Sequence, residues 1–275
     1  MPAAPVLQPP PLNLRVEGRG EHAVVMLHGW PDTLALWDGT VAALSPHLRC
    51  ARFTLPGYDA ADPPRAVSLA EVVDLLAQAV DRISPDRPVA LMLHDWGCFF
   101  GYHYARLHPQ RVARIVGIDV GDAGSRAHRR DIGWRGALMV AAYQWPLALA
   151  WRIGGWWGDR IAMRTAQAVR CPEPRAAVAR MGYPYWITWT ATHGSYHAAR
   201  PYRFDSPCPM FYAYGRRKPL HFHSRAWAEG LTARGDCRVQ AFDCGHWVMR
   251  SRAAEFHAAV LDWLEPWLRA PSQPV

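Results

Sequence analysis

The chain has 275 residues, half of them hydrophobic and 20% charged, with a formal net charge of +8. This length suits one large domain or a core with an inserted segment, and the composition excludes disordered, collagen-like and coiled-coil proteins. The basic residues are scattered arginines and a single lysine, Lys218. Because a nucleic-acid binder more often carries a dense basic stripe or a recognisable module, we expect no nucleic-acid partner.

The cysteine pattern and the first residues of the chain favour a cytoplasmic protein. The six cysteines are widely spread and no two have C-x-x-C spacing, which favours reduced thiols. Residues 1–14 are rich in proline and lack the apolar run of a signal peptide. The apolar segment 137–157 is interrupted by Pro146, Arg152 and Gly154, so we expect a buried or substrate-lining helix pair rather than a membrane span.

Short apolar runs alternate with helical patterns along the first part of the chain. Strands are predicted at residues 23–27, 50–55, 88–93 and 112–118, and helices at residues 34–48, 68–83 and 99–107. The helix at 68–83 has the clearest signal, since Ser68 and Glu71 form a capping-box pattern before apolar residues spaced three and four apart.

The pattern changes after residue 122. Residues 123–205 are predicted to be helical and aromatic, whereas strands are predicted again at 208–214 and 239–242, with helices at 224–233 and 253–268. Strands that alternate with helices predict an α/β fold, a mostly parallel sheet covered by helices on both faces. We therefore predict one core domain made of residues 1–122 and 206–275, with residues 123–205 inserted as a helical cap.

The sequence LMLHDWGC at residues 91–98 predicts a strand, a tight turn and a helix in succession. This is the setting of a nucleophile elbow, in which a sharp turn projects one side chain from the end of a sheet. The familiar motif is G-x-S-x-G, but here the central residue is Asp95, with Gly97 after it and Leu93 where the first Gly usually stands. An aspartate in this position also serves as a plain helix N-cap, which is the alternative interpretation.

Two further motifs follow predicted strands. HGWP at residues 28–31 follows the first strand, and GHW at residues 245–247 follows the last. The backbone N–H groups of Trp30 and Trp96 are the predicted donors of an oxyanion hole. His246 is the predicted general base.

Together these motifs resemble the α/β-hydrolase fold superfamily, in the branch with an aspartate nucleophile that includes epoxide hydrolases and haloalkane dehalogenases. The resemblance runs from residue 28 to about residue 268 and is weakest in the cap. It implies a hydrolase without a cofactor or metal, in which Asp95 attacks a saturated carbon, as in an epoxide, and forms an alkyl ester. Water activated by His246 then hydrolyses that ester. The expected partner is a small apolar organic substrate.

The acid that orients His246 departs from the usual pattern of this resemblance. Many relatives carry it in a G-x-x-D pattern after the strand at 208–214, where this chain has GRRK and therefore Lys218. One dehalogenase subgroup carries the acid at the end of the strand after the elbow helix, a place that Asp119 occupies here. Asp119 is the predicted acid, and Asp122, Asp243 or no acid at all stay open.

The candidate substrate-binding residues come from the elbow and the cap. The resemblance implies that cap tyrosines hold an epoxide oxygen, or that Trp96 helps to hold a halide. Leu93 and Asp119 resemble dehalogenases, but Trp30 stands where dehalogenases have Asn, and together with the cap tyrosines this favours epoxide opening over dehalogenation. The cap tyrosines are Tyr143, Tyr183, Tyr185, Tyr196 and Tyr202, with residues 182–186 as the main candidate region and plain aromatic packing as the alternative.

A non-catalytic α/β-hydrolase fold that binds a small ligand is the competing function. Lys218 in the acid position and Leu93 in the elbow motivate it. A histidine that points away from Asp95, or that has no carboxylate at its other ring nitrogen, would favour the binding protein, whereas a carboxylate there would favour the enzyme.

Overall fold

The computed structural model describes residues 12–59, 62–192, 196 and 204–270. Within these residues, seven strands form one sheet in the order β1-β3-β2-β4-β5-β6-β7. β1 pairs antiparallel with β3, and the other neighbours in this sheet run parallel. The strands are β1 (Arg15–Glu17), β2 (Ala23–Leu27), β3 (Arg49–Arg52), β4 (Val89–His94), β5 (Val112–Ile118), β6 (Met210–Gly215) and β7 (Arg238–Phe242).

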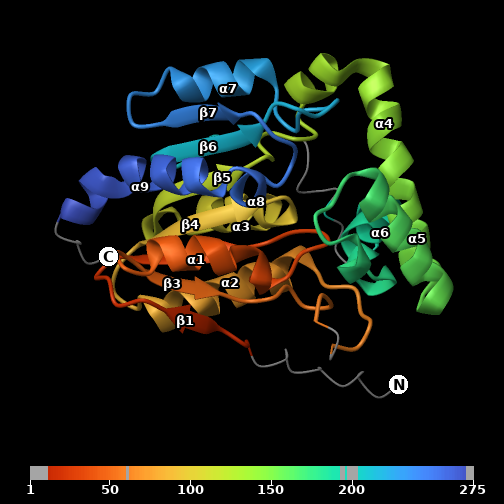
Figure 1. Ribbon diagram of the computed structural model, residues 1–275, viewed down its shortest axis with the longest axis horizontal. Helices are drawn as coiled ribbons and strands as arrows, with labels where there is room; N and C mark the ends of the chain where they lie inside the picture. Colours follow the sequence, from red (N-terminus) through yellow and green to blue (C-terminus); the bar gives the residue numbers. More distant parts are fainter. Residues whose placement is uncertain (1–11, 60–61, 193–195, 197–203, 271–275) are drawn as a thin grey trace.

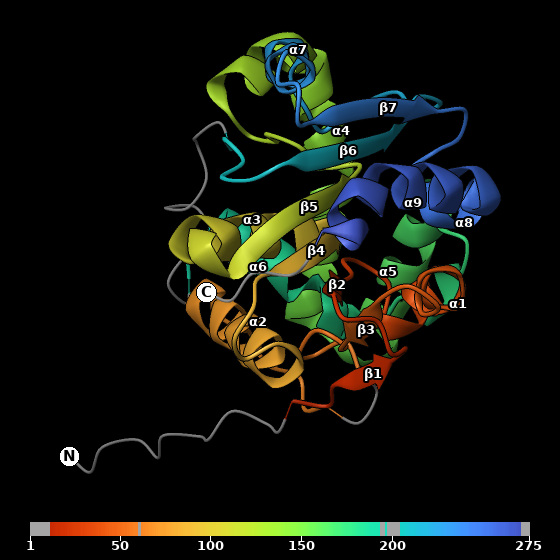
Figure 2. The ribbon, with the colours of Figure 1, turned by 90° about the vertical axis from the view of Figure 1, so that its left-hand side faces the viewer.

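Helices cover both faces of the sheet. Figures 1 and 2 show α2 (Leu69–Ile83) and α3 (Trp96–Leu107) on one face, and α1 (Asp38–Leu44), α8 (Val248–Ser251) and α9 (Ala253–Arg269) on the other. α7 (Arg225–Thr232) lies beside β7. All residues of β2 and β4 are buried, which explains why these strands are continuous apolar runs rather than alternating ones.

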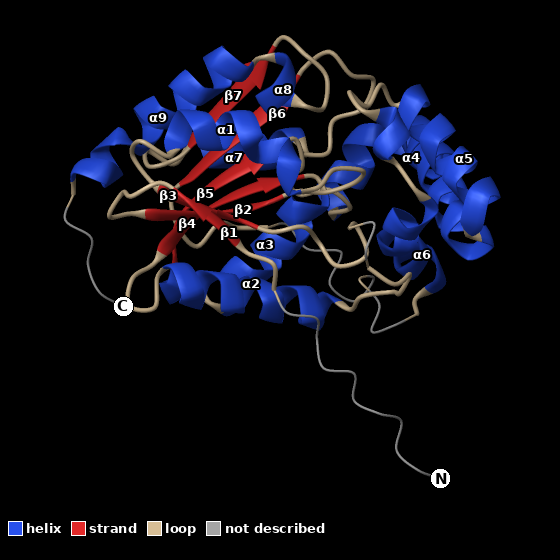
Figure 3. Cartoon of the chain, turned by 60° about the horizontal axis from the view of Figure 1, so that its bottom comes forward, coloured by secondary structure: helices blue, strands red, loops and turns tan. Residues whose placement is uncertain are grey.

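The chain between β5 and β6 forms a separate group of helices, which we call the cap helices: α4 (Arg126–Ile153), α5 (Gly155–Ala168) and α6 (Tyr183–Thr190). Figure 3 shows them together beyond one end of the sheet. α4 contacts both α5 and α6, and it departs from helical geometry at Gly133, where φ is 59°. The predicted α/β fold with a mostly parallel sheet and a helical insertion is confirmed. The limits at 122/123 and 205/206 stay predictions.

The predicted elements differ from the structure in three places. The helix predicted at residues 34–48 is a 3₁₀ turn (Leu34–Trp37) followed by the short helix α1. The sequence missed β1 and α8, because three or four residues are too few to show a period. The segment 137–157 spans most of α4 and the start of α5, and it is not fully buried, since Trp145 and Leu149 of α4 and Trp156 and Trp157 of α5 are exposed. The other half of the expectation agrees with the structure, because residues of α4 line a cavity described below.

The strand register brings the candidate residues to one edge of the sheet. Leu27 is level with Leu93, His94 with Ile118, and Ile118 with Ala213. Because parallel strands end at the same edge, the loops that follow β2, β4, β5, β6 and β7 are neighbours, and sites in such sheets form at these carboxyl ends.

Candidate active site

Asp95 occupies a sharp turn between β4 and α3. Its φ of 53° lies in the left-handed region, a strained conformation that clusters at functional sites. Close packing holds the turn: a Cβ on Gly97 would lie 2.2 Å from the carbonyl oxygen of Leu27. The carboxylate does not make the side-chain hydrogen bond of a helix N-cap, which would come from an N–H beyond the first residue of α3, so the alternative interpretation as an N-cap finds no support in the geometry.

Backbone donors converge on the Asp95 carboxylate. The N–H of Trp30 donates to Oδ1 of Asp95 at 2.8 Å, and the N–H of Trp96 also donates to this carboxylate. Gly29 makes the approach possible, because a Cβ there would lie 2.3 Å from Oδ1 of Asp95 and 2.5 Å from the nitrogen of Trp96. The two predicted oxyanion donors therefore lie together at this carboxylate.

His246 lies between two carboxylates. Its Nε2 is 3.6 Å from Oδ2 of Asp95, and its Nδ1 faces Oδ2 of Asp119 within hydrogen-bond distance. The imidazole thus has a carboxylate at each ring nitrogen. A carboxylate at the second ring nitrogen favours an enzyme over a non-catalytic binding protein.

Asp119 is fully buried and has three hydrogen-bond partners. Besides facing His246, its Oδ2 accepts a hydrogen bond from Nζ of Lys218 at 2.5 Å, and its Oδ1 accepts one from the N–H of Gly215 at 3.0 Å. Lys218 is the only lysine of the chain, and its side chain is 10% exposed. The lysine that stands in the usual acid position therefore binds an acid from the neighbouring strand.

These contacts set the ionisation of the site. Burial opposes the charge of Asp119, but Lys218 and His246 outweigh it and lower the pKa of Asp119 to about 2. Burial likewise opposes the charge of Asp95, yet His246 holds its pKa below the usual range. For His246, burial disfavours the imidazolium, but Asp119 and Asp95 raise the pKa to about 9.

The sequence reasoning missed a second buried layer behind His246. The ring of His94 lies 4.4 Å from that of His246, and Nδ1 of His94 is 3.9 Å from Oδ2 of Asp32. Asp32 also accepts a hydrogen bond from Nε1 of Trp247 at 2.9 Å. Burial raises the pKa of Asp32 to about 7 and lowers that of His94 to about 3, so this layer favours neutral groups. His94 lies within the elbow motif at residues 91–98, and Asp32 directly follows HGWP at residues 28–31, so their positions in the sequence were the available signal.

The other two candidate acids lie elsewhere. Both oxygens of the buried Asp122 accept hydrogen bonds from Ser125 and Ser224, at 2.6 to 2.7 Å. Asp243 is bound by the guanidinium groups of Arg216 and Arg217. Among the described contacts, neither acid meets His246, so these alternatives are wrong: Asp122 already has its partners at two helix ends, and Asp243 faces solvent-exposed arginines.

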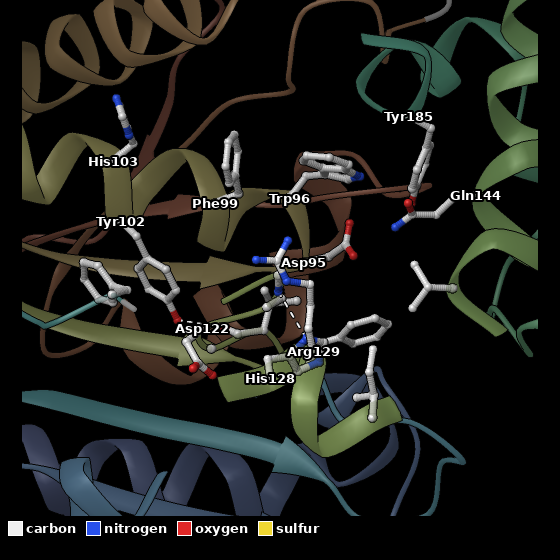
Figure 4. Close-up of a pocket in the computed structure, with 18 of the residues that line it drawn as sticks. Asp95, Trp96, Phe99, Tyr102, His103, Asp122, His128, Arg129, Gln144 and Tyr185 are labelled. Carbon is white, nitrogen blue, oxygen red and sulfur yellow. Dashed lines mark hydrogen bonds between the residues drawn. The ribbon is translucent and has the colours of Figure 1, made fainter. Parts of the chain in front are cut away.

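A cavity of about 440 Å³ opens beside Asp95. Trp96 and Phe99 of α3 line it, together with Tyr143 of α4, Tyr185 of α6 and Phe222. Figure 4 shows Trp96, Phe99 and Tyr185 around the carboxylate of Asp95. An apolar cavity with a few polar groups next to a strained carboxylate is typical of a small-molecule site.

The structure separates the candidate tyrosines. Tyr143 and Tyr185 line the cavity, whereas Tyr183 does not: it packs against Tyr58, with ring centroids 5.9 Å apart. Residues two positions apart in an α-helix are separated by about 200° around the helix axis. Tyr183 and Tyr185 therefore face opposite sides of α6, and only one of them can reach the cavity. The hydroxyl of Tyr196 donates to the carbonyl of Val67.

Because Tyr183 packs against Tyr58 and does not line the cavity, its predicted role as a substrate contact is corrected to that of a packing residue. Tyr202 lies outside the described residues. Two histidines after β6, His221 and His223, lie near the site, and Nδ1 of His223 is hydrogen-bonded to the hydroxyl of Tyr212 at 2.9 Å. In the part of the chain that the structure describes, no three His, Cys, Asp or Glu side chains are placed to hold a metal ion.

Comparison with known proteins gives the same fold. Residues 22–156 match the family model described as alpha/beta hydrolase fold. A solved Bacillus megaterium epoxide hydrolase, in complex with an inhibitor, has a TM-score of 0.68 at 15% identity over 92% of this chain and 96% of its own. A haloalkane dehalogenase variant of Bradyrhizobium elkanii has a TM-score of 0.63 at 19% identity, over 92% of both chains.

The chain spans less than half the length of the curated relatives it matches. The probable oxidoreductase EphD of Mycobacterium tuberculosis is 34% identical over 108 residues, 38% of this chain and 18% of its own length. The cis-3-alkyl-4-alkyloxetan-2-one decarboxylase of Shewanella oneidensis is 31% identical over 116 residues, 38% of this chain and 34% of its own. A pimeloyl-[acyl-carrier protein] methyl ester esterase of Vibrio campbellii is 32% identical over 115 residues, 41% of each chain.

Proposed function

We propose that this chain, which has the α/β-hydrolase fold, is a hydrolase that opens an epoxide, or a similar electrophilic sp³ carbon, through an alkyl ester on Asp95. One observation carries this proposal: His246 lies between the elbow carboxylate Asp95 and the buried carboxylate Asp119. A serine at the elbow would indicate acyl transfer, whereas a carboxylate there suits attack on a saturated carbon.

The first step is attack by Oδ2 of Asp95. The N–H of Trp30 holds Oδ1, so the other oxygen is left to face the cavity and His246. A bond forms from Oδ2 to the epoxide carbon as the carbon–oxygen bond of the ring breaks. The ring oxygen takes a proton from a cavity tyrosine, for which Tyr185 is our first choice and Tyr143 the second.

The second step is hydrolysis of the ester. His246 takes a proton from water, the oxygen adds to the carbonyl carbon of Asp95, and the N–H groups of Trp30 and Trp96 stabilise the oxyanion. The intermediate then collapses as the ester carbon–oxygen bond breaks, and the leaving alkoxide takes the proton of the new carboxyl group, which releases the diol and restores the Asp95 carboxylate. The proton on His246 returns to the tyrosinate through solvent, so both groups are ready for the next turnover. Ester formation has meanwhile neutralised Asp95, which removes one of the two carboxylates that raise the pKa of His246. The imidazole therefore becomes a competent base when a base is needed.

A single turnover in ¹⁸O-water tests this chemistry. Oxygen from water enters the carboxylate of Asp95 and not the first product, and peptide mass spectrometry detects the label. In His246→Gln the ester accumulates, since attack on carbon needs no base. The control is His47→Gln, which changes an exposed histidine before β3. An active enzyme that puts the first label into product would show direct attack by water and defeat the proposal.

Dehalogenation by the same ester is the second candidate. Trp96 follows the elbow carboxylate and lines the cavity beside Asp95, and an indole N–H donor there suits a halide leaving group. A panel of epoxides, bromoalkanes and carboxylic esters distinguishes the reactions by diol, halide or acid released. Tight binding of panel members without any product would favour the non-catalytic ligand-binding protein instead.

A further inference from the structure

The cap helices carry a large exposed apolar face, which we call the cap face. Among the described residues eleven large hydrophobic side chains are exposed, and nine of them lie between residues 134 and 189. The cap face consists of Trp134, Leu138, Met139, Trp145, Leu149, Ile153, Trp156, Trp157 and Trp189. On α4 the residues 134, 138, 145, 149 and 153 recur at intervals of four and seven, which places them on one side of the helix.

The surroundings of the cap face are strongly basic. Residues 126–170 contain eight arginines and two aspartates, one of which, Asp159, accepts a hydrogen bond from the backbone of Ala179. The guanidinium of Arg160 lies 4.8 Å from the ring centre of Trp156, and that of Arg135 lies 5.3 Å from the ring centre of Trp134. Arginine and tryptophan side chains therefore contact one another at two places on the cap face.

We propose that the cap face docks onto the surface of an anionic lipid bilayer. Tryptophan is enriched at the level of lipid headgroups because its ring is apolar and its N–H is polar. Arginine stems cover apolar surface while their guanidinium groups reach lipid phosphates. Within the described residues no helix combines the length and the apolar character needed to cross a bilayer. The cap helices would thus lie in the plane of the headgroups.

A second copy of the chain fits this surface less well. A two-fold dimer would place the same arginine-rich face against itself, and like charges would then meet across the interface. An anionic membrane supplies the opposite charge. The opposite side of α4 carries Val140 and Tyr143, which line the cavity beside Asp95. A docked cap would therefore separate the cavity from the lipid by a single helix, which suits an apolar substrate.

Vesicle flotation of the full chain tests the docking, using phosphatidylcholine with one-quarter phosphatidylglycerol and pure phosphatidylcholine. We expect binding to the anionic vesicles, weakened by high salt, and little binding to the neutral ones. The assay needs no substrate, so its result is independent of the proposed hydrolase activity. Absence of binding to anionic vesicles at low salt would overturn the proposal.

Matched substitutions locate the contact. Leu149 and Leu107 are helical leucines with 50% and 51% exposure, so Leu149→Ser is expected to weaken vesicle binding by about fivefold while Leu107→Ser leaves it unchanged. Arg152→Glu changes the charge by two and is expected to weaken binding by about 25-fold, with Arg19→Glu, in the loop after β1, as its control. Circular dichroism checks the fold of each variant.

Equal losses in the paired variants would contradict a contact through the cap face. Analytical sedimentation measures the oligomeric state. If the protein binds no vesicles but forms a dimer that Trp156→Ser and Leu149→Ser dissociate, the cap face contacts a second copy of the chain, and membrane docking is refuted.

Discussion

The ammonium group of Lys218 lies 2.5 Å from Oδ2 of Asp119, the same oxygen that faces the imidazole of His246. Two cations therefore share one carboxylate oxygen when His246 is protonated. Lys218 is 10% exposed, and its Nζ also lies 5.0 Å from the ring centre of Phe222. Because Lys218 stabilises the charge of Asp119 and repels a second cation, it limits how strongly Asp119 can raise the pKa of His246.

Replacing Lys218 with Met is expected to shift the pH profile of ester hydrolysis. Without the ammonium group the imidazolium of His246 is more stable, so its pKa rises by about one unit. Hydrolysis needs the neutral imidazole. The pH at which the rate of ester hydrolysis rises is therefore expected to be higher in the variant than in the parent protein. Lys218→Arg keeps the charge and should keep the profile. Stopped-flow measurement of ester decay checks this, and identical profiles for Met and Lys would contradict it.

The parent protein should itself show a pH-dependent ester population. The pKa of Asp95 lies below its usual range, so its attack on carbon is constant above about pH 5. His246 has a pKa of about 9 before the ester forms and a lower one afterwards, since the Asp95 charge is gone. The ester therefore accumulates at low pH and disappears as pH rises. Acid-quenched mass spectrometry of the steady state measures it.

Asp119→Asn and Asp122→Asn are expected to act differently. The first removes the carboxylate that orients His246, so ester hydrolysis should slow by about 10³- to 10⁴-fold while ester formation changes little. The second weakens hydrogen bonds to Ser125 and Ser224, which should lower the free energy of unfolding by about 1–3 kcal/mol and leave turnover intact. Single-turnover kinetics and thermal unfolding separate the two. If hydrolysis were lost in Asp122→Asn but not in Asp119→Asn, the residue that orients His246 would be Asp122.

Gly29→Ala should remove activity. The added Cβ would lie 2.5 Å from the nitrogen of Trp96 and 2.3 Å from Oδ1 of Asp95, so the donors and the carboxylate must move apart. Losing one oxyanion donor costs about 100- to 1000-fold in rate. Gly39→Ala is the matched control: its Cβ meets no atom within 4 Å, and a helical alanine is expected to stabilise the protein by up to about 1 kcal/mol. An active Gly29→Ala would refute this geometry.

The sequence predicted the central strands well because β2 and β4 are continuous apolar runs that end at recognisable motifs. β2 and β5 have the predicted bounds, and Asp95, His246 and Asp119 meet as proposed from their places after strands. The sequence did not predict which side chains come into contact, or which helix faces stay exposed, once the chain has folded. Nothing in GRRK shows that Lys218 reaches across to Asp119, and the apolar segment 137–157 does not show which of its faces remains exposed.

The carboxylate of Asp122 is bound by Ser125 and Ser224, which cap the first turns of α4 and α7. The carboxylate of Asp122 therefore links the start of α4 to the start of α7 through hydrogen bonds within the protein. The first position beyond the start of α4 with a non-helical backbone is Gly133. Gly133 therefore divides α4 into a short first part, held at Ser125, and a longer part that packs against α5 and α6.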